Sequence, residues 1–426
     1  MRRRTFIKNT GLAISALPLY SATFQNQTYK VALIGCGWWG MNILREAIAY
    51  GQCRVVGLCD VDQKSMVAAK EEVGRLNGNT PKIYGDYREL ITREKPDIAI
   101  VATPDHWHAL PAIMAIKNGA HVYIEKPIGH TIGEGQAVLK AARTYDRKVQ
   151  VGTHRRLSSH NISAMEFLRS GKAGKIVQVK AFVNYQQGPG ISAPDSDPPE
   201  GLDWNMWLGP APERNYNPRI HPKGFRQYLD FANGTMADWG IHWFDQVLWW
   251  TEEKSPKHIY SYGDRYIKQD GSDAPDTQLA IFQFESFTLE WEHKLCTGNL
   301  NEAHNVGCYF YGTEGTLHLG WLDGWTFYPK GKSKSTLTTK PVLHDPDHQN
   351  IKECWADFIQ AIAQDNLPVC DIETGHLASN ISLLGMISYK LGRSIVWDGE
   401  REIVPDDPEA NKLLSRQYRG AWEYPK

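Results

Sequence analysis

The chain has 426 residues and is almost neutral, with 47 lysines and arginines against 48 aspartates and glutamates. Hydrophobic residues make up 42% of the sequence and charged residues 22%, which excludes a disordered, collagen-like or small disulfide-stapled protein. A formal charge of −1 also argues against nucleic acid as a partner, because broad binding to phosphates needs a basic surface. The 15 tryptophans are a first indication of carbohydrate binding, since indole rings stack on sugars, although they also fill cores.

Residues 1–22 are predicted to be an export signal. Three arginines at positions 2–4 precede Thr5-Phe6-Ile7-Lys8, and the apolar run that follows, Gly11 to Leu19, is too short to span a membrane. Paired arginines in this setting are typical of a twin-arginine signal, while an ordinary secretory signal or an uncleaved basic tail stays open. No cysteine follows the run, so we expect no membrane anchor and a periplasmic or otherwise exported protein. Removal of the leader's four cations takes the formal charge from −1 to about −5.

A dinucleotide-binding unit is predicted directly after the leader. The apolar, strand-length run Lys30–Ile34 is followed by Gly35, Gly37 and Gly40 in GxGxxG spacing, and then by a segment with helical spacing. Gly35 permits a tight turn, Gly37 lets a pyrophosphate approach the backbone, and Gly40 lets the helix pack on the strand. A second strand ends at Asp60, about 20 residues beyond Gly40, where a carboxylate binds the ribose hydroxyls. Because a carboxylate repels a 2′-phosphate, NAD is favoured over NADP.

Two further strand–helix units place polar residues at the same edge of the predicted sheet. The strand 98–102 leads into Thr103-Pro104, and the strand 121–124 ends at Glu125-Lys126-Pro127. Open α/β sheets bind ligands at the carboxyl ends of their strands. Lys126 is therefore well placed for proton chemistry, with a surface lysine at a strand end as the alternative.

His106 and His108 form a His-x-His pair that raises the question of a zinc site. No cysteine or third histidine lies at a usual ligand spacing, and the seven cysteines include no CxxC pair. We interpret both histidines as packing or hydrogen-bonding residues beside the nucleotide. The His/Asp-rich stretch from His344 to Asn350 is interpreted as a loop and helix cap, so no metal is expected.

The glycine fingerprint, Thr103-Pro104 and Glu125-Lys126-Pro127 together resemble the glucose–fructose oxidoreductase/inositol dehydrogenase (Gfo/Idh/MocA) family, from about Lys30 to at least Arg393. The resemblance implies an α/β Rossmann domain followed by an α+β domain with a large, mostly antiparallel open sheet. The expected divisions are a signal peptide at 1–22, an NAD-binding domain at 30–148, a substrate-binding domain at 149–393 and a C-terminal tail at 394–426. The expected cofactor-binding residues are Gly35, Gly37, Trp38, Trp39, Gly40, Asp60, Thr103, Pro104, His108, Glu125 and Lys126.

Asp238 and His242 share one face of a helix predicted from Ala237 to Trp250, because they lie four residues apart. A carboxylate one turn from an imidazole can orient it and hold its proton. Members of the family carry an Asp-x-x-x-His pair at this point, which forms the catalytic group with the lysine of Glu-Lys-Pro. The resemblance therefore implies that Asp238, His242 and Lys126 are catalytic. Asp245 can either reach the same imidazole or form a salt bridge elsewhere.

The second half of the chain is expected to bind the substrate and to form the open sheet. The segment from Gln186 to Pro222 is a long loop rich in proline, glycine, aspartate and tryptophan, as in a lid or binding loop. Alternating runs from Thr277 to His293 and from Asn305 to Leu319 predict antiparallel strands, and an uncovered sheet face favours a homo-oligomer. The candidate sugar-binding residues are His154, Arg156, Trp204, Trp207, Asp238, Trp239, His242 and Trp243.

These features predict an NAD-dependent oxidoreductase that oxidises a secondary ring hydroxyl of a sugar or glycoside, with a 3-keto sugar as one candidate product. His242 takes the hydroxyl proton, Lys126 assists and stabilises the alkoxide, and Asp238 orients His242. An exported enzyme meets no pool of free NAD, so tightly bound NAD is expected. A redox-neutral glycosidase or lyase acting through a transient keto sugar stays open, although such relatives tend to replace Glu-Lys-Pro. The third alternative is a cofactor-bearing binding protein without turnover, against which the intact catalytic set argues.

Overall fold

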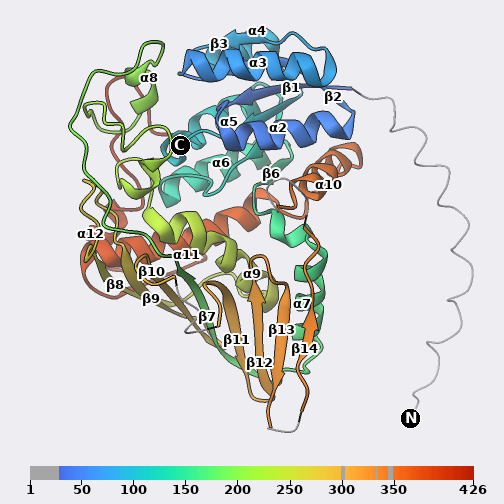
Figure 1. Ribbon diagram of the computed structural model, residues 1–426, viewed down its shortest axis with the longest axis vertical. Helices are drawn as coiled ribbons and strands as arrows, with labels where there is room; N and C mark the ends of the chain where they lie inside the picture. Colours follow the sequence, from blue (N-terminus) through green and yellow to red (C-terminus); the bar gives the residue numbers. More distant parts are fainter. Residues whose placement is uncertain (1–27, 299–302, 332–333, 344–348) are drawn as a thin grey trace, which may run out of the picture.

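The computed structural model describes residues 28–298, 303–331, 334–343 and 349–426. The expected signal at 1–22 and residues 344–348 of the His/Asp-rich stretch lie outside these residues. Within them the chain forms two sheets, one above the other in Figure 1, each packed against helices. In the stretches that are described, no helix is long and apolar enough to cross a membrane.

The first sheet is parallel, and its strands run in the order β3-β2-β1-β4-β5-β6. All residues of β4 are fully buried, because helices cover both faces of a parallel sheet and its strands are continuous apolar runs. The chain leaves β1 in one direction towards β2 and returns on its other side as β4, and ligands bind in the crevice at such a switch point. The elements are β1 Tyr29–Ile34, α2 Trp38–Tyr50, β2 Cys53–Cys59, α3 Gln63–Asn77, β3 Lys82–Tyr84, α4 Tyr87–Glu94, β4 Ile98–Val101, α5 Ala109–Lys117, β5 His121–Ile124, α6 Ile132–Thr144 and β6 Val149–Val151.

Local capping explains where several of these helices begin and end. Helix α2 stops at Gly51, whose φ of 89° is a left-handed conformation that suits glycine. Asp62 and Asp86 accept N-cap hydrogen bonds at the starts of α3 and α4. Thr131 and Glu134 form a capping box at α6. Each of these signals lies next to the helix end that it determines.

The predicted large, mostly antiparallel sheet is confirmed, with the order β14-β13-β12-β11-β7-β10-β9-β8-β15 and one parallel pairing recorded, between β7 and β10. Helices α7, α9 and α11 pack on one face, and α11 also contacts α6 of the first sheet. The other face carries exposed apolar side chains such as Tyr262, Leu279 and Ile281. The elements are α7 Ser159–Arg169, β7 Ile176–Asn184, α8 Trp204–Leu208, α9 Ile241–Thr251, β8 His258–Asp264, β9 Thr277–Gln283, β10 Thr288–Lys294, β11 Val306–Gly312, β12 Gly315–Gly320, β13 Trp325–Pro329, β14 Leu337–Thr339, α11 Ile372–Leu391 and β15 Ile395–Val396.

Late parts of the chain return to the first sheet. Helix α10 (Ile351–Ala363) packs on α2, and the tail that contains α12 (Pro408–Lys412) reaches back to place Trp422 edge-on against Trp107 at 4.8 Å. The expected boundary between residues 148 and 149 falls just before β6, which pairs with β5 in the first sheet. The two sheets are therefore joined by contacts that cross the divisions expected along the chain.

Candidate active site

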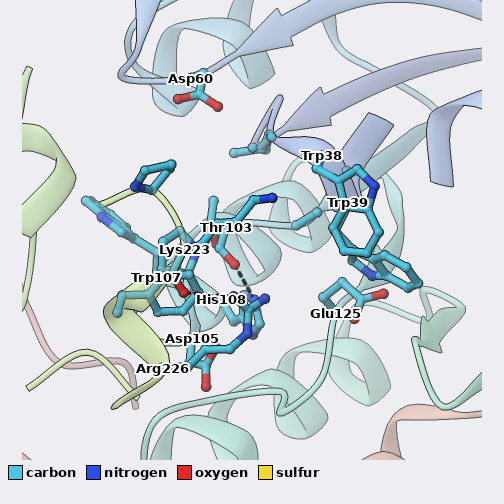
Figure 2. A pocket seen from close by; sticks show the side chains of 18 of the residues that line it. Trp38, Trp39, Asp60, Thr103, Asp105, Trp107, His108, Glu125, Lys223 and Arg226 are labelled. Carbon is cyan, nitrogen blue, oxygen red and sulfur yellow. Dashed lines mark hydrogen bonds between the residues drawn. The ribbon is translucent and has the colours of Figure 1, made fainter. Parts of the chain in front are cut away.

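A cavity of about 630 Å³ opens at the carboxyl ends of β1, β2, β4 and β5, on the side facing the second half of the chain (Figure 2). Its volume lies within the range of about 300–1,000 Å³ that is usual for small-molecule sites. Most of the predicted site residues line it, although they come from distant parts of the sequence. These are Gly35, Gly37, Trp38, Trp39, Gly40, Asp60, Thr103, Pro104, His108, Glu125, Lys126, His154, Trp207, Asp238, Trp239 and His242.

The three glycines of the fingerprint occupy their positions for different structural reasons. Gly35 has a φ of 97°, and a Cβ there would lie 2.5 Å from the carbonyl oxygen of Ala102. A Cβ on Gly40 would collide with the carbonyl oxygen of Gly35, so this glycine lets α2 pack on the turn. A Cβ on Gly37 would have no atom within 4 Å. Gly35 and Gly40 are thus required by the fold, whereas Gly37 keeps open a surface that a ligand can approach.

Two polar groups along the cavity fit a dinucleotide. The Asp60 carboxylate accepts hydrogen bonds from the backbone N–H groups of Cys36 at 2.7 Å and Asp62 at 3.0 Å. Burial raises the pKa of Asp60, and these hydrogen bonds oppose the rise. The Thr103 hydroxyl is buried and has no partner among the described residues, so it is free to bind a ligand. Figure 2 shows Asp60 at the far end of the cavity from Glu125 and Arg226, as an elongated ligand requires.

His108 ties the loop after β4 to the loop after β5. Its Nε2 lies 2.7 Å from the carbonyl oxygen of Thr103 (Figure 2), and its Nδ1 lies 2.5 Å from that of Pro127. His106 Nε2 lies 3.0 Å from the carbonyl oxygen of Trp207. Burial lowers the pKa of His106 to about 3 and that of His108 to about 4. These contacts support the interpretation of both histidines as packing and hydrogen-bonding residues.

Lys126 and Asp238 form the central ion pair of the site, although 112 residues separate them. Lys126 Nζ donates hydrogen bonds of 2.8 Å to the carboxylate and to the carbonyl oxygen of Asp238. Arg226 also lies on this carboxylate, with its Nε 3.3 Å from Oδ1. Burial alone would raise the pKa of Asp238, but Lys126 and Arg226 outweigh burial and lower it. Asp238 is therefore an anion that holds Lys126 in place.

His242 is not oriented by Asp238, contrary to what the spacing predicts. Met236–Gly240 forms a π-helical turn before α9, and a π turn has more residues per turn than an α-helix. Residues four apart therefore no longer stack on one face, and Asp238 turns towards Lys126 instead. His242 Nδ1 is buried without a hydrogen-bond partner among the described residues. Burial, and then the charge of Lys126, lower the pKa of His242 well below its usual value, so the imidazole is a neutral base.

Two buried carboxyl groups lie near Lys126 and Arg226. Burial raises the pKa of Glu125 to about 7, with Lys126 acting in the opposite direction. Burial raises the pKa of Asp105 to about 7 as well, opposed mainly by Arg226. Any side chain at position 152 would collide with Glu125, so Gly152 makes room for it. Both acids can exchange protons near neutral pH.

Aromatic side chains form one wall of the cavity beside His242. The central one, Trp321, was not predicted as a site residue from the sequence. Trp321 follows β12 and lies 4.9 Å from the ring of His242 and 5.0 Å from that of Trp239. The guanidinium of Arg155 covers the Trp321 ring at 3.8 Å. Arg226, in the 3₁₀ turn Gly224–Gln227, was also missed. Both lie in segments without a motif, and only the packing of the sheets brings them to the cavity.

Arg156, Trp204 and Trp243 lie outside the cavity lining. Arg156 Nε donates to both carboxylate oxygens of Asp245, at 2.8 and 2.9 Å, so Asp245 forms a salt bridge and does not reach His242. The ring of Trp204 stacks on that of Trp207 with centroids 4.5 Å apart, so it packs against a residue of the cavity lining. Trp243 is almost fully buried in the core beneath the sheet.

The long loop expected from Gln186 to Pro222 crosses to the first domain. Gln63 N–H donates to the Gly201 carbonyl, and Asp203 N–H donates to the Val61 carbonyl, both at 2.9 Å. Lys223, just beyond the loop, places its Nζ 5.9 Å from the ring centre of Trp38. The segment thus covers the cavity beside the fingerprint.

Comparison with known proteins agrees with this geometry. Residues 29–153 match the family model described as oxidoreductase family, NAD-binding Rossmann fold, and residues 185–424 match the C-terminal alpha/beta domain of the same family. A glycosyl hydrolase family 109 protein of Stenotrophomonas maltophilia is 28% identical over 49% of this chain and 48% of its own length. The putative oxidoreductase YteT of Bacillus subtilis is 25% identical over 49% of this chain and 42% of its own length. The chain thus spans about half the length of these curated relatives.

Solved structures share the fold over most of the chain. The aldose-aldose oxidoreductase of Caulobacter crescentus, complexed with glycerol, superposes with a TM-score of 0.66 at 17% identity, over 87% of this chain and 100% of that one. Levoglucosan dehydrogenase, in complex with NADH and levoglucosan, gives 0.67 at 17% identity, over 87% and 99%. At such identities the likeness shows the fold. Because the two family models together match well over half of its residues, the chain belongs to the Gfo/Idh/MocA oxidoreductase family, and its first domain is an NAD-binding Rossmann domain.

Proposed function

We propose that this protein oxidises a secondary ring hydroxyl of a sugar or glycoside with NAD as its cofactor. The observation that carries the proposal is the meeting of Lys126, Asp238 and His242 at one wall of the fingerprint cavity. Trp239 and Trp321 provide flat apolar faces beside this group, as sugar rings require. Keto-sugar formation, including the 3-keto form, is part of the proposal.

The residues present divide the proton chemistry between them. His242, neutral and buried, takes the proton of the substrate hydroxyl as general base. Lys126 stabilises the negative charge that develops on the same oxygen, because its Nζ is preorganised by Asp238. Asp238 is thus a positioning residue for Lys126 and not for His242. When bound, NAD⁺ supplies the acceptor for the hydride.

The cofactor is expected to remain bound between turnovers. The segment from Gly201 to Lys223 lies over the fingerprint and is fastened to Val61 and Gln63 by backbone hydrogen bonds. Export through the twin-arginine leader at 1–22 would carry the folded, loaded protein to a compartment without free NAD. The exposed apolar face of the second sheet is the expected contact in a homo-oligomer.

A redox-neutral glycosidase is the second candidate, favoured by the name of the Stenotrophomonas relative. In that reaction the sugar is oxidised to a keto form, the acidified carbon beside the ketone loses its proton, and the leaving group departs from the next carbon. Water then adds to the resulting double bond, and the ketone is reduced again. The retained Glu125-Lys126-Pro127 motif favours net oxidation, because the NAD-dependent glycosidases of the family tend to replace it.

Purified protein assayed on a panel of glycosides without added NAD separates the candidates. A keto sugar together with an absorbance change of reduced nicotinamide supports the dehydrogenase. Release of free sugar with no net cofactor reduction would instead establish the glycosidase. If neither product forms while substrate binds, the protein is a binding protein, and mass spectrometry of the bound nucleotide identifies its cofactor.

A further inference from the structure

Three potential metal ligands meet on the open face of the second sheet, away from the cavity. His304 lies two residues before the start of β11, His318 lies within β12, and Asp323 lies in the turn between β12 and β13. One ligand atom from each residue lies within 4.8 Å of the others. None of the three lines the active-site cavity.

The two imidazoles and the carboxylate are in direct contact. The rings of His304 and His318 stack with centroids 3.5 Å apart and planes inclined by 17°. His304 Nδ1 lies 2.7 Å from Asp323 Oδ2. His318 is 1% exposed, and its Nε2 is buried without a hydrogen-bond partner among the described residues. An unpaired buried nitrogen costs about 1–3 kcal/mol, so a ligand for this nitrogen would stabilise the fold.

A pair of glycines makes room for the cluster. Gly307 of β11 and Gly320 of β12 face each other in the antiparallel register. A Cβ on Gly307 would collide with His318 Nε2, and a Cβ on Gly320 would collide with the Asp323 carboxylate. The missing side chains therefore leave a hollow in the sheet surface that holds the nitrogen and oxygen donors side by side.

We propose that His304, His318 and Asp323 bind a zinc ion. Two imidazole nitrogens and one carboxylate oxygen suit a borderline metal, whereas Mg²⁺ and Ca²⁺ prefer sites built of oxygen alone. Tetrahedral zinc, with bonds of about 2.0–2.1 Å to nitrogen, holds its ligand atoms roughly 3.3 Å apart. The present spacing, within 4.8 Å, requires a movement on the order of 1 Å. The partly exposed His304 ring must tilt out of the stack, because a nitrogen lone pair lies in its ring plane.

The ion would fix the strand end that carries the aromatic wall. Trp321 stands between His318 and Asp323 in the chain and contacts His242 across the cavity. Holding His318, three residues before Trp321, and Asp323, two residues after it, restrains the tryptophan ring. The ion itself touches no residue of the catalytic group, so its role is structural, and its binding does not depend on the proposed sugar oxidation.

Metal-stripped full-length protein titrated with Zn²⁺, and in parallel with Mg²⁺ and Ca²⁺, tests the site by calorimetry and thermal melting. One zinc per chain should bind and raise the melting temperature, while Mg²⁺ and Ca²⁺ do neither. Asp323→Asn and His304→Gln should each weaken zinc binding at least tenfold; both side chains are partly exposed, so the variants keep their fold. His258→Gln, at an exposed histidine of β8, is the matched control and should bind zinc like the wild type. Absence of binding, or binding unchanged in the Asp323→Asn/His304→Gln double variant, would overturn the proposal.

Discussion

Replacement of Lys126 by methionine tests the proposed role of the central ion pair most directly. The change keeps the length of the side chain but removes the ammonium group that donates two hydrogen bonds of 2.8 Å to Asp238. Methionine cannot stabilise the alkoxide that forms when His242 removes the substrate proton. The substitution therefore separates the electrostatic role of Lys126 from the filling of space.

The expected effect is large on the chemical step and modest on the fold. Loss of one preorganised donor to a developing oxyanion lowers kcat by about 10²–10³, which is about 2.7–4 kcal/mol. Lys126 is 12% exposed, and Arg226 remains 3.3 Å from the Asp238 carboxylate, which therefore keeps one cation. The free energy of unfolding should accordingly fall by only about 1–3 kcal/mol.

Lys148→Met is the matched control. The Lys148 side chain is 8% exposed, and its Nζ lies 2.8 Å from Asp365 and 3.4 Å from Asp146, but it does not line the cavity. This variant removes a lysine of similar burial and pairing, so kcat should stay at the wild-type value.

Single-turnover reduction of the bound cofactor, started by adding the sugar, measures the step. The nucleotide content and the thermal unfolding of each variant are recorded in parallel, so that loss of cofactor or of fold is not taken for loss of chemistry. If folded, NAD-loaded Lys126→Met reduces its cofactor within tenfold of the wild-type rate, the proposed role of the lysine is wrong.

Three further substitutions test other parts of the site. Gly37→Ala should fold normally yet lose bound NAD, whereas Gly35→Ala should melt at a lower temperature, because only Gly35 has a left-handed φ and a crowded Cβ position; equal melting temperatures would refute this difference. Trp321→Ala should raise the KM for the sugar about twofold to tenfold through lost stacking of about 0.5–1.5 kcal/mol, while Trp250→Ala, outside the cavity, leaves KM unchanged in steady-state assays. The pKa of His106 is lowered to about 3, so the unfolded chain takes up a proton below about pH 6.5 that the folded chain does not. The free energy of unfolding should therefore decrease as the pH is lowered from about 6.5 to about 3. His106→Gln should reduce the slope of this free energy against pH by about 1.4 kcal/mol per pH unit in urea unfolding, and an unchanged slope contradicts the pKa shift.

The sequence was sufficient wherever the determining contacts are local. The strand that ends at Ile34, just before Gly35, and the helix that follows the glycine fingerprint depend on backbone sterics and hydrogen bonds within a few residues. The order of apolar runs and glycines likewise predicted the parallel sheet and the cavity at its edge. Lys126 and His242 could be named as site residues because the Glu-Lys-Pro and Asp-x-x-x-His motifs that contain them match the family that the chain resembles.

The partners of these residues depended on long-range packing. Asp238 was expected to orient His242, but a π turn and the approach of β5 from the first sheet direct it to Lys126. Arg156 was expected to contact the sugar, but its guanidinium forms a salt bridge with the buried carboxylate of Asp245. The spacing of residues along one helix contains no information about charged groups that approach from distant parts of the chain.

The sequence by itself thus determined the nucleotide fold and the large second sheet, and it named many of the residues that line the cavity, on the basis of short motifs, periodicity and the family resemblance. The tertiary structure decided which charges pair, placed Trp321 and Arg226 at the site, and brought His304, His318 and Asp323 together over two facing glycines. The physical reason is that an ion pair or a ring contact acts over a few ångströms in space. Only the packing of two sheets, built from segments more than a hundred residues apart, sets those distances.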